Sequence, residues 1–140
     1  MKPWSGKRAV LWAAECHFAQ ECRADLFQAA ATLTQRGCRV QAVFSRGELR
    51  GLLSELSPDL IVACVCGRSR EPIDLLRQIR AEEAEFPPVL LMAGATDLPL
   101  YLEGMRNGAF DCLALPAKEG ELARLVSKAL GAREPEAAAV

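Results

Sequence analysis

Short apolar runs alternate with longer amphipathic segments along the chain, and this alternation predicts a domain of mixed strands and helices. Five apolar runs have the length of strands, and each is followed by a segment with helical spacing of its apolar positions. The predicted strands cover residues 8–13, 39–44, 57–67, 89–93 and 110–115. The predicted helices cover residues 19–35, 45–56, 71–84, 98–107 and 118–130.

The third strand is apolar at every position from Leu60 to Val65 and ends at a loop that contains Gly67. A strand that is apolar on both faces is typical of the middle of a parallel sheet with helices on each side. In such open sheets, ligands bind just beyond the carboxyl ends of the strands. Cys64 and Cys66 are therefore predicted to lie where a functional site would form.

Capping residues in the sequence predict where several helices begin and end. Ser45 with Glu48 three residues later is typical of a capping box at the start of the second helix. Gly37 and Gly108 are predicted to end the first and fourth helices. In the third helix, the predicted amphipathic face consists of Ile73, Leu76, Ile79 and Arg80.

Strand and helix alternate five times at spacings that suit right-handed crossover connections. This pattern predicts an α/β fold, a five-stranded parallel sheet that is doubly wound with helices on both faces, in three layers. We expect one domain over residues 7–131, with flexible termini at residues 1–6 and 132–140.

Composition narrows the function classes. Apolar residues make up 51% of the chain and charged residues 25%, which is typical of a globular protein. The net charge of −1 does not indicate binding to nucleic acid or to a membrane surface. No apolar run is long enough to span a membrane, and the N-terminus lacks the apolar core of a signal peptide. We therefore expect a cytoplasmic protein. The six cysteines lie in predicted strands and helices, where we expect mostly buried, reduced thiols.

Four stretches together resemble the receiver domain of bacterial response regulators, which has a flavodoxin-like fold, over nearly the whole chain. They are residues 7–15, Pro58–Cys64, Pro88–Ala93 and Gly104–Pro116, and the Gly-Ala-x-Asp-x-Leu-x-x-Pro pattern that begins at Gly108 is the most specific of them. By this resemblance, the Leu115–Pro116 peptide bond is expected to be cis.

The resemblance implies that the chemistry of the family has been lost. Cys64 stands at the position of the phosphorylated aspartate, and Ala13 and Ala14 stand where an acidic pair holds the metal ion. Ala93 replaces the hydroxyl residue and Leu115 replaces the lysine that contact the phosphoryl group. Methyl groups cannot ligate Mg²⁺, and nothing neutralises a transferring phosphoryl group. We therefore expect a pseudo-receiver with no cofactor, no catalytic residues and no enzymatic activity.

The cysteines support a second hypothesis, a thiol-based metal or redox sensor. Cys16, His17, Cys64 and Cys66 map to the carboxyl edge of the predicted sheet, and sulfur and imidazole ligands suit zinc. Packing of ordinary buried thiols explains the same residues without any site. A third hypothesis is an intact phosphorylation switch built from unconventional residues.

The leading hypothesis is a phosphorylation-independent signalling module that binds a protein partner or a second copy of itself. By resemblance, the face formed by the fourth helix, fifth strand and fifth helix is the expected interface. Leu98, Tyr101, Leu102 and Met105 fit a buried stripe of the fourth helix, which leaves Leu100 as the exposed candidate. We expect no output domain within 140 residues, so that the output lies in another chain or outside this sequence. The predicted interface residues are Leu100, Tyr101, Arg106, Glu121 and Arg124.

Overall fold

The structure is a computed structural model. It describes residues 2–13, 20–65, 70–82, 85–94, 98–115, 117–118 and 120–131, without the side chains of residues 20–23. Within these residues, five parallel strands form one sheet in the order β2-β1-β3-β4-β5. The predicted fold class is confirmed.

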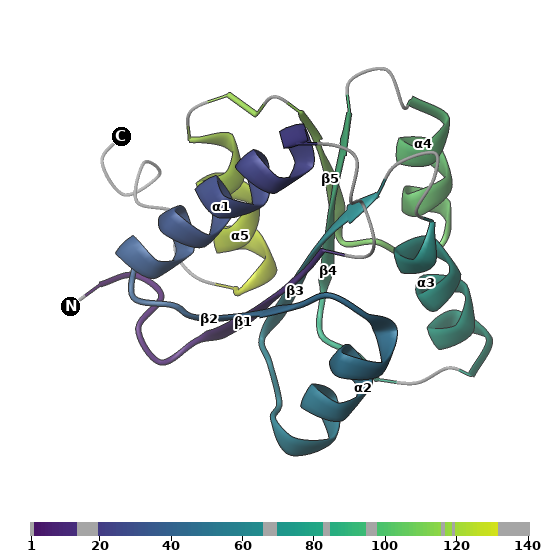
Figure 1. The fold of residues 1–140 in the computed structure, drawn as a ribbon, viewed down its shortest axis with the longest axis horizontal. Helices are drawn as coiled ribbons and strands as arrows, with labels where there is room; N and C mark the ends of the chain where they lie inside the picture. Colours follow the sequence, from purple (N-terminus) through teal and green to yellow (C-terminus); the bar gives the residue numbers. More distant parts are fainter. Residues whose placement is uncertain are drawn as a thin grey trace.

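The helices lie on both faces of the sheet, as Figure 1 shows. Helices α1 and α5 cover one face, and α2, α3 and α4 cover the other. The strands are β1 (Arg8–Trp12), β2 (Arg39–Val43), β3 (Leu60–Val65), β4 (Val89–Gly94) and β5 (Asp111–Leu115). The helices are α1 (Gln20–Gln35), α2 (Arg46–Glu55), α3 (Glu71–Glu82), α4 (Leu98–Arg106) and α5 (Glu121–Ala129).

The central strand is β3, and all six of its residues are buried. It pairs with β1 on one side and with β4 on the other, so that Ala63 lies beside Trp12 and Leu91. Its side chains alternate between the two faces, as in any strand. Leu60, Val62 and Cys64 face α1 and α5, and the intervening residues face the other helices.

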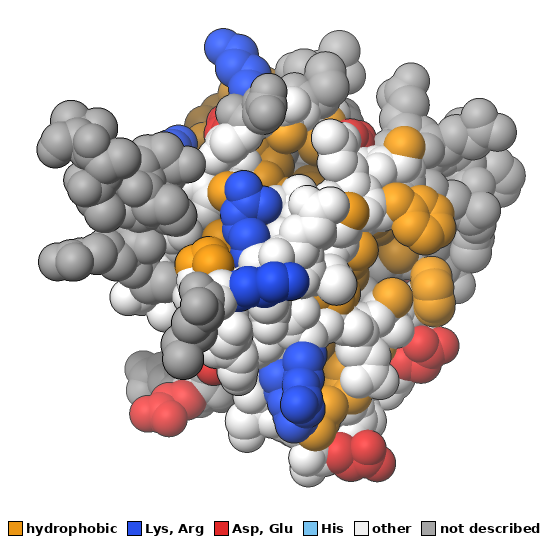
Figure 2. Space-filling view, turned by 90° about the vertical axis from the view of Figure 1, so that its left-hand side faces the viewer, with side chains coloured by type: hydrophobic (Ala, Val, Ile, Leu, Met, Phe, Trp, Pro, Cys, Tyr) orange, Lys and Arg blue, Asp and Glu red, His pale blue; other side chains and the backbone are white. Residues whose placement is uncertain are grey.

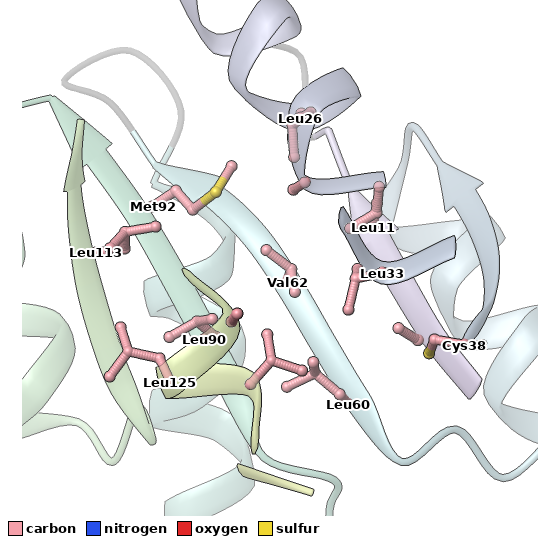
Figure 3. Packing of buried hydrophobic residues seen from close by; sticks show 14 of the residues in the cluster. Leu11, Leu26, Leu33, Cys38, Leu60, Val62, Leu90, Met92, Leu113 and Leu125 are labelled. Atoms are coloured by element: carbon pink, nitrogen blue, oxygen red, sulfur yellow. The ribbon is translucent and has the colours of Figure 1, made fainter. Parts of the chain in front are cut away.

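The core on the α1 and α5 side is built mainly from aliphatic side chains of these two helices and of the sheet face that they cover. Figure 3 shows Leu26 and Leu33 of α1 and Leu125 of α5 directed toward Val62 and Leu90 of the sheet. The inner face of α1 includes Leu26, Ala29 and Leu33, which are buried. Figure 2 shows the outer side of this layer, where basic side chains lie along the middle and hydrophobic side chains gather toward one side.

The start of α2 largely follows the capping box that the sequence predicts. The Ser45 hydroxyl accepts a hydrogen bond from the backbone N–H of Glu48 at 3.0 Å. The Glu48 carboxylate accepts from the backbone N–H of Phe44 at 3.1 Å, one residue before the expected donor. The first bond satisfies an N–H group that the first turn of the helix leaves without a partner, and the second ties the residue before the N-cap to the helix.

Helices α3 and α5 differ from the sequence prediction in detail. Ile73 and Leu76 of α3 are buried and Ile79 is half-buried, but Arg80 is exposed and donates to the carbonyl of Arg106. A guanidinium at the boundary of the apolar face reaches solvent along its flexible stem, which is why the prediction was wrong for Arg80. Helix α5 begins at residue 121, because Gly120 takes a left-handed conformation with φ of 82°.

The amino-terminal segment belongs to the core, contrary to the expected flexible terminus. Trp4 is only 1% exposed, and its indole N–H donates to the Ser127 hydroxyl of α5 at 3.3 Å. Its backbone N–H donates to the carbonyl of Arg36, whose guanidinium lies 5.5 Å from the centre of the indole ring. The indole thus closes the end of the α1 and α5 layer and supplies the buried Ser127 with a partner.

The orientation of α4 is set by a close approach to the sheet. Leu100 and Gly104 are its buried residues, and a Cβ at Gly104 would lie 2.4 Å from the Cδ1 atom of Leu91. Only a residue without a side chain lets the helix backbone approach β4 this closely. The face of α4 that contains Gly104 is therefore the face that packs on the sheet.

We predict that Gly104→Ala destabilises the domain although alanine favours helices. The new methyl group overlaps a fully buried leucine, and such overpacking costs about 1–3 kcal/mol. Gly51→Ala in α2 is the matched control, because no atom lies within 4 Å of its Cβ position. Helix propensity alone raises the stability of that variant by up to about 1 kcal/mol. Equal stabilisation of both variants in urea unfolding would contradict the packing argument.

Candidate functional site

The candidate site lies at the carboxyl edge of the sheet, where the sequence predicts a degenerate phosphorylation pocket. Cys64 is 0% exposed near the end of β3, and its Cα partner in β4 is Met92. Leu115 at the end of β5 belongs to the same buried cluster, against which Ala13 is packed. Ala93 belongs to the cluster on the opposite face of the sheet. The fold thus brings Ala13, Cys64 and Leu115 to one face and leaves Ala93 on the other.

None of these four described side chains carries an oxygen or nitrogen atom. The methyl groups of Ala13 and Ala93 and the isobutyl group of Leu115 supply no ligand for a hard cation. The Cys64 thiol is buried among aliphatic side chains of the core. What these positions do is extend the apolar core to the end of the strands.

Several residues of the predicted sites lie outside the described residues. These are Ala14 of the predicted phosphorylation pocket, Cys16, His17 and Cys66 of the alternative metal site, and the Leu115–Pro116 peptide bond. In the described parts of the chain, no three His, Cys, Asp or Glu residues come close enough together to hold a metal ion. Cys64 is therefore the one member of the alternative site whose surroundings are described.

The described thiols are packing residues, as the sequence predicts. Cys38, Cys64 and Cys112 are reduced and buried. Burial, with a smaller effect of Asp59, raises the pKa of Cys38 to about 11. Burial, with a smaller effect of Asp111, raises the pKa of Cys112 to about 12. A thiol with a raised pKa holds little of the thiolate that reacts or binds metals.

A second functional feature is an exposed apolar stripe on α4, and here the sequence prediction was wrong. Leu100, the predicted exposed residue, is 6% exposed and packs in the core. Leu98, Leu102 and Met105 are instead 60%, 48% and 37% exposed, and we call these three residues the α4 stripe. The close approach at Gly104 rotates the helix so that the predicted buried stripe faces outward. Gly104 in mid-helix was the signal in the sequence that marks the packed face.

The other predicted interface residues lie on α4 and α5. Tyr101 is half-buried, and burial, followed by Asp111 with smaller effects of Cys112 and Glu121, raises the pKa of its hydroxyl. These neighbours place Tyr101 on the side of α4 that faces β5 and α5. Arg106 and Arg124 are exposed, and Glu121 is half-buried with its carboxylate near the backbone N–H of Lys118.

Comparison with known proteins identifies the fold. The chain is 36% identical over 84 residues to the transcriptional regulatory protein FixJ of Bradyrhizobium diazoefficiens, a match that covers 57% of this chain and 40% of FixJ. It superposes on the crystal structure of FixJ-N with a TM-score of 0.72 and 18% identity, covering 91% of this chain and 95% of that one. The receiver domain of the response regulator TorR superposes with a TM-score of 0.69 and 23% identity, covering 89% and 97%.

The chain has the fold of these receiver domains, and its sequence is similar to that of FixJ. A further relative, the C4-dicarboxylate transport transcriptional regulatory protein DctD of Pseudomonas aeruginosa, is 30% identical over 102 residues, which cover 73% of this chain. The receiver-like chain spans less than half the length of these curated relatives, 40% of FixJ and 22% of DctD. No protein-family model matches the chain.

The described helices give no candidate for a membrane span, because none of them is both long and apolar enough to cross a bilayer.

We predict that iodoacetamide at pH 8 leaves Cys38, Cys64 and Cys112 unmodified in the folded protein, because their thiols are buried. Peptide mapping by mass spectrometry, with urea-unfolded protein as the control, measures this. The raised pKa values of Cys38 and Cys112 also make the free energy of unfolding depend on pH. The unfolded chain loses these thiol protons first, so the free energy of unfolding falls as the pH rises from about 9 toward about 11–12. Rapid alkylation of any of the three in folded protein would contradict this assignment.

Proposed function

We propose that this chain is an atypical response-regulator domain that acts in the cytoplasm as a phosphorylation-independent protein-interaction module. The observation that carries the proposal is the combination of an apolar strand edge with an exposed apolar stripe on α4. The similarity to FixJ and to receiver domains supports a role in two-component signal transduction. The interface is the face of α4, β5 and α5, with the α4 stripe at its centre.

Phosphorylation independence follows from the chemistry of the described pocket positions. Phosphoryl transfer is catalysed by positioning and by charge neutralisation, which a metal ion and a lysine supply in most such sites. A buried thiol at Cys64 and a leucine at residue 115 supply neither. A phosphoryl group bound there makes no contact that differs between conformations of the domain, so it does not favour one conformation over another.

The position of α4 is held by contacts with α3 instead. The Glu103 carboxylate accepts from the guanidinium groups of both Arg70 and Arg77, and Arg80 donates to the carbonyl of Arg106 at the end of α4. Each exposed pair is worth about 0–1 kcal/mol. Together, Arg77 and Arg80 of α3 and Arg70 just before it nevertheless tie the middle and the end of α4 to α3. We infer that the α4 stripe is presented constitutively.

The α4 stripe is similar to the apolar centre of a protein–protein interface. Three large apolar side chains at spacings of four and three residues form one line along a helix, which an apolar surface of a partner or second copy can bury. Arg106 of α4 and Glu121 and Arg124 of α5 are the proposed polar rim, which is the common arrangement at protein interfaces.

Acetyl phosphate with Mg²⁺ is expected to leave the mass of the intact protein unchanged, because the described pocket lacks an acceptor carboxylate and a cation site. Intact mass spectrometry measures the adduct, and a receiver domain that keeps its aspartate is the positive control. Beryllofluoride is likewise expected to cause no change in the amide spectrum of the protein. A stoichiometric acyl-phosphate adduct would refute phosphorylation independence.

Leu102→Glu is expected to weaken self-association or partner binding about ten- to a hundred-fold, since burying one leucine contributes about 1.5–3 kcal/mol. Its free energy of unfolding should change by less than about 0.5 kcal/mol, because the side chain is 48% exposed. Phe27→Glu is the matched control, since Phe27 is 75% exposed on α1 in the opposite layer. Sedimentation equilibrium and pull-down from native extract measure association. The interface is wrongly assigned if Phe27→Glu abolishes association and Leu102→Glu does not.

A further inference from the structure

A groove of about 170 Å³ separates α2 from α3 on the face of the sheet opposite α1 and α5. Leu49 forms part of its floor and is only 1% exposed. Four half-buried apolar side chains form its walls and one end, so that the groove offers apolar surface to solvent. These side chains are Leu53 of α2, Leu75 and Ile79 of α3, and Phe86 of the connection to β4.

The α2 wall of the groove is positively charged. Arg46 and Arg50 lie four residues apart on one side of α2, which places them one helical turn apart. Arg46 donates to the side-chain carbonyl of Gln78 across the groove, and Gln78 in turn donates to Glu82 at 3.2 Å. Arg50 is exposed, and no carboxylate of the described residues forms an ion pair with it.

The guanidinium of Arg46 is poorly solvated in this position. Its Nε–H is buried and has no hydrogen-bond acceptor among the described residues. A cation held over apolar side chains gains more from a carboxylate than a fully hydrated one does, because the local dielectric constant is lower. The α2 wall therefore favours an anionic group placed beside Arg46 and Arg50, above the apolar floor.

We propose that this groove binds an acidic amphipathic helix of a protein partner. Carboxylates four residues apart on such a helix match the spacing of Arg46 and Arg50, and a leucine-sized side chain on the same side enters the groove. The apolar contacts supply affinity, and the charge pairs fix the direction and register of the helix. The surface is separate from the α4 stripe, so that the domain holds two partners at once.

A second copy of this chain fits the groove less well. Among the described residues, α4 is the helix that exposes the most large apolar side chains, those of the α4 stripe, but its one carboxylate is Glu103. That carboxylate is already shared by Arg70 and Arg77. The exposed charge on the outer side of α4 is Arg106, which repels Arg46 and Arg50. The occupant with complementary charge is therefore a different chain.

The test uses a blocked, alanine-based helical peptide with leucines four residues apart and glutamates four residues apart on the adjoining side. Fluorescence anisotropy of the labelled peptide, titrated with the full chain, measures binding, and amide chemical shifts of ¹⁵N-labelled protein locate it. We expect binding that maps to α2 and α3 and weakens with added salt. Peptides with lysine in place of glutamate, or serine in place of leucine, are expected not to bind.

Arg50→Glu is expected to weaken binding by about tenfold or more, because it reverses a charge that faces the bound carboxylate. Arg124→Glu on α5 makes the same change in net charge far from the groove and should leave binding unchanged, as should Leu102→Glu in the α4 stripe. The proposal is overturned if the acidic peptide fails to bind or if Arg50→Glu binds it equally well. It is also overturned if Arg50→Glu reduces only self-association, which would assign the groove to a second copy.

Discussion

The complete burial of β3 is the constraint on which the other elements depend. A strand that is apolar on both faces must have a strand on each side and helices above and below it. Leu60, Val62 and Cys64 therefore draw α1 and α5 onto one face, and Ile61, Ala63 and Val65 draw α2, α3 and α4 onto the other. The sheet separates the two clusters, and β3 contributes side chains to both. A substitution in β3 therefore affects the packing of helices on both faces.

The same burial bears on the chemistry of the carboxyl edge of the sheet. In the receiver fold, the carboxyl edge of the sheet is where a polar site would interrupt the core, because ligands bind beyond the strand ends. In this chain the described positions of that edge are aliphatic or thiol side chains, and they continue the core instead. These positions therefore place no charged side chain in the core, where burying an unpaired charge costs free energy.

Helices α4 and α2 present two different kinds of surface. The α4 stripe is apolar, and the helix that carries it is also paired through Glu103 with Arg70 and Arg77. The groove beside α2 combines an apolar floor with the positive charges of Arg46 and Arg50. Helix α3 contributes to both, because its arginines hold α4 and its Ile79 lines the groove. A single helix thus borders both proposed interfaces.

The sequence by itself determined the strands, the helices, the fold class and the buried thiols, because hydrophobic periodicity and local capping act over a few residues. It also placed Cys64, Ala93 and Leu115 at strand ends. The tertiary structure decided which way α4 faces, since Gly104 and Leu91 meet only in the folded sheet and both faces of α4 are apolar. It likewise decided that Trp4 joins the core, because its partner Ser127 lies 123 residues away. Contacts at such separation leave no local pattern in the chain.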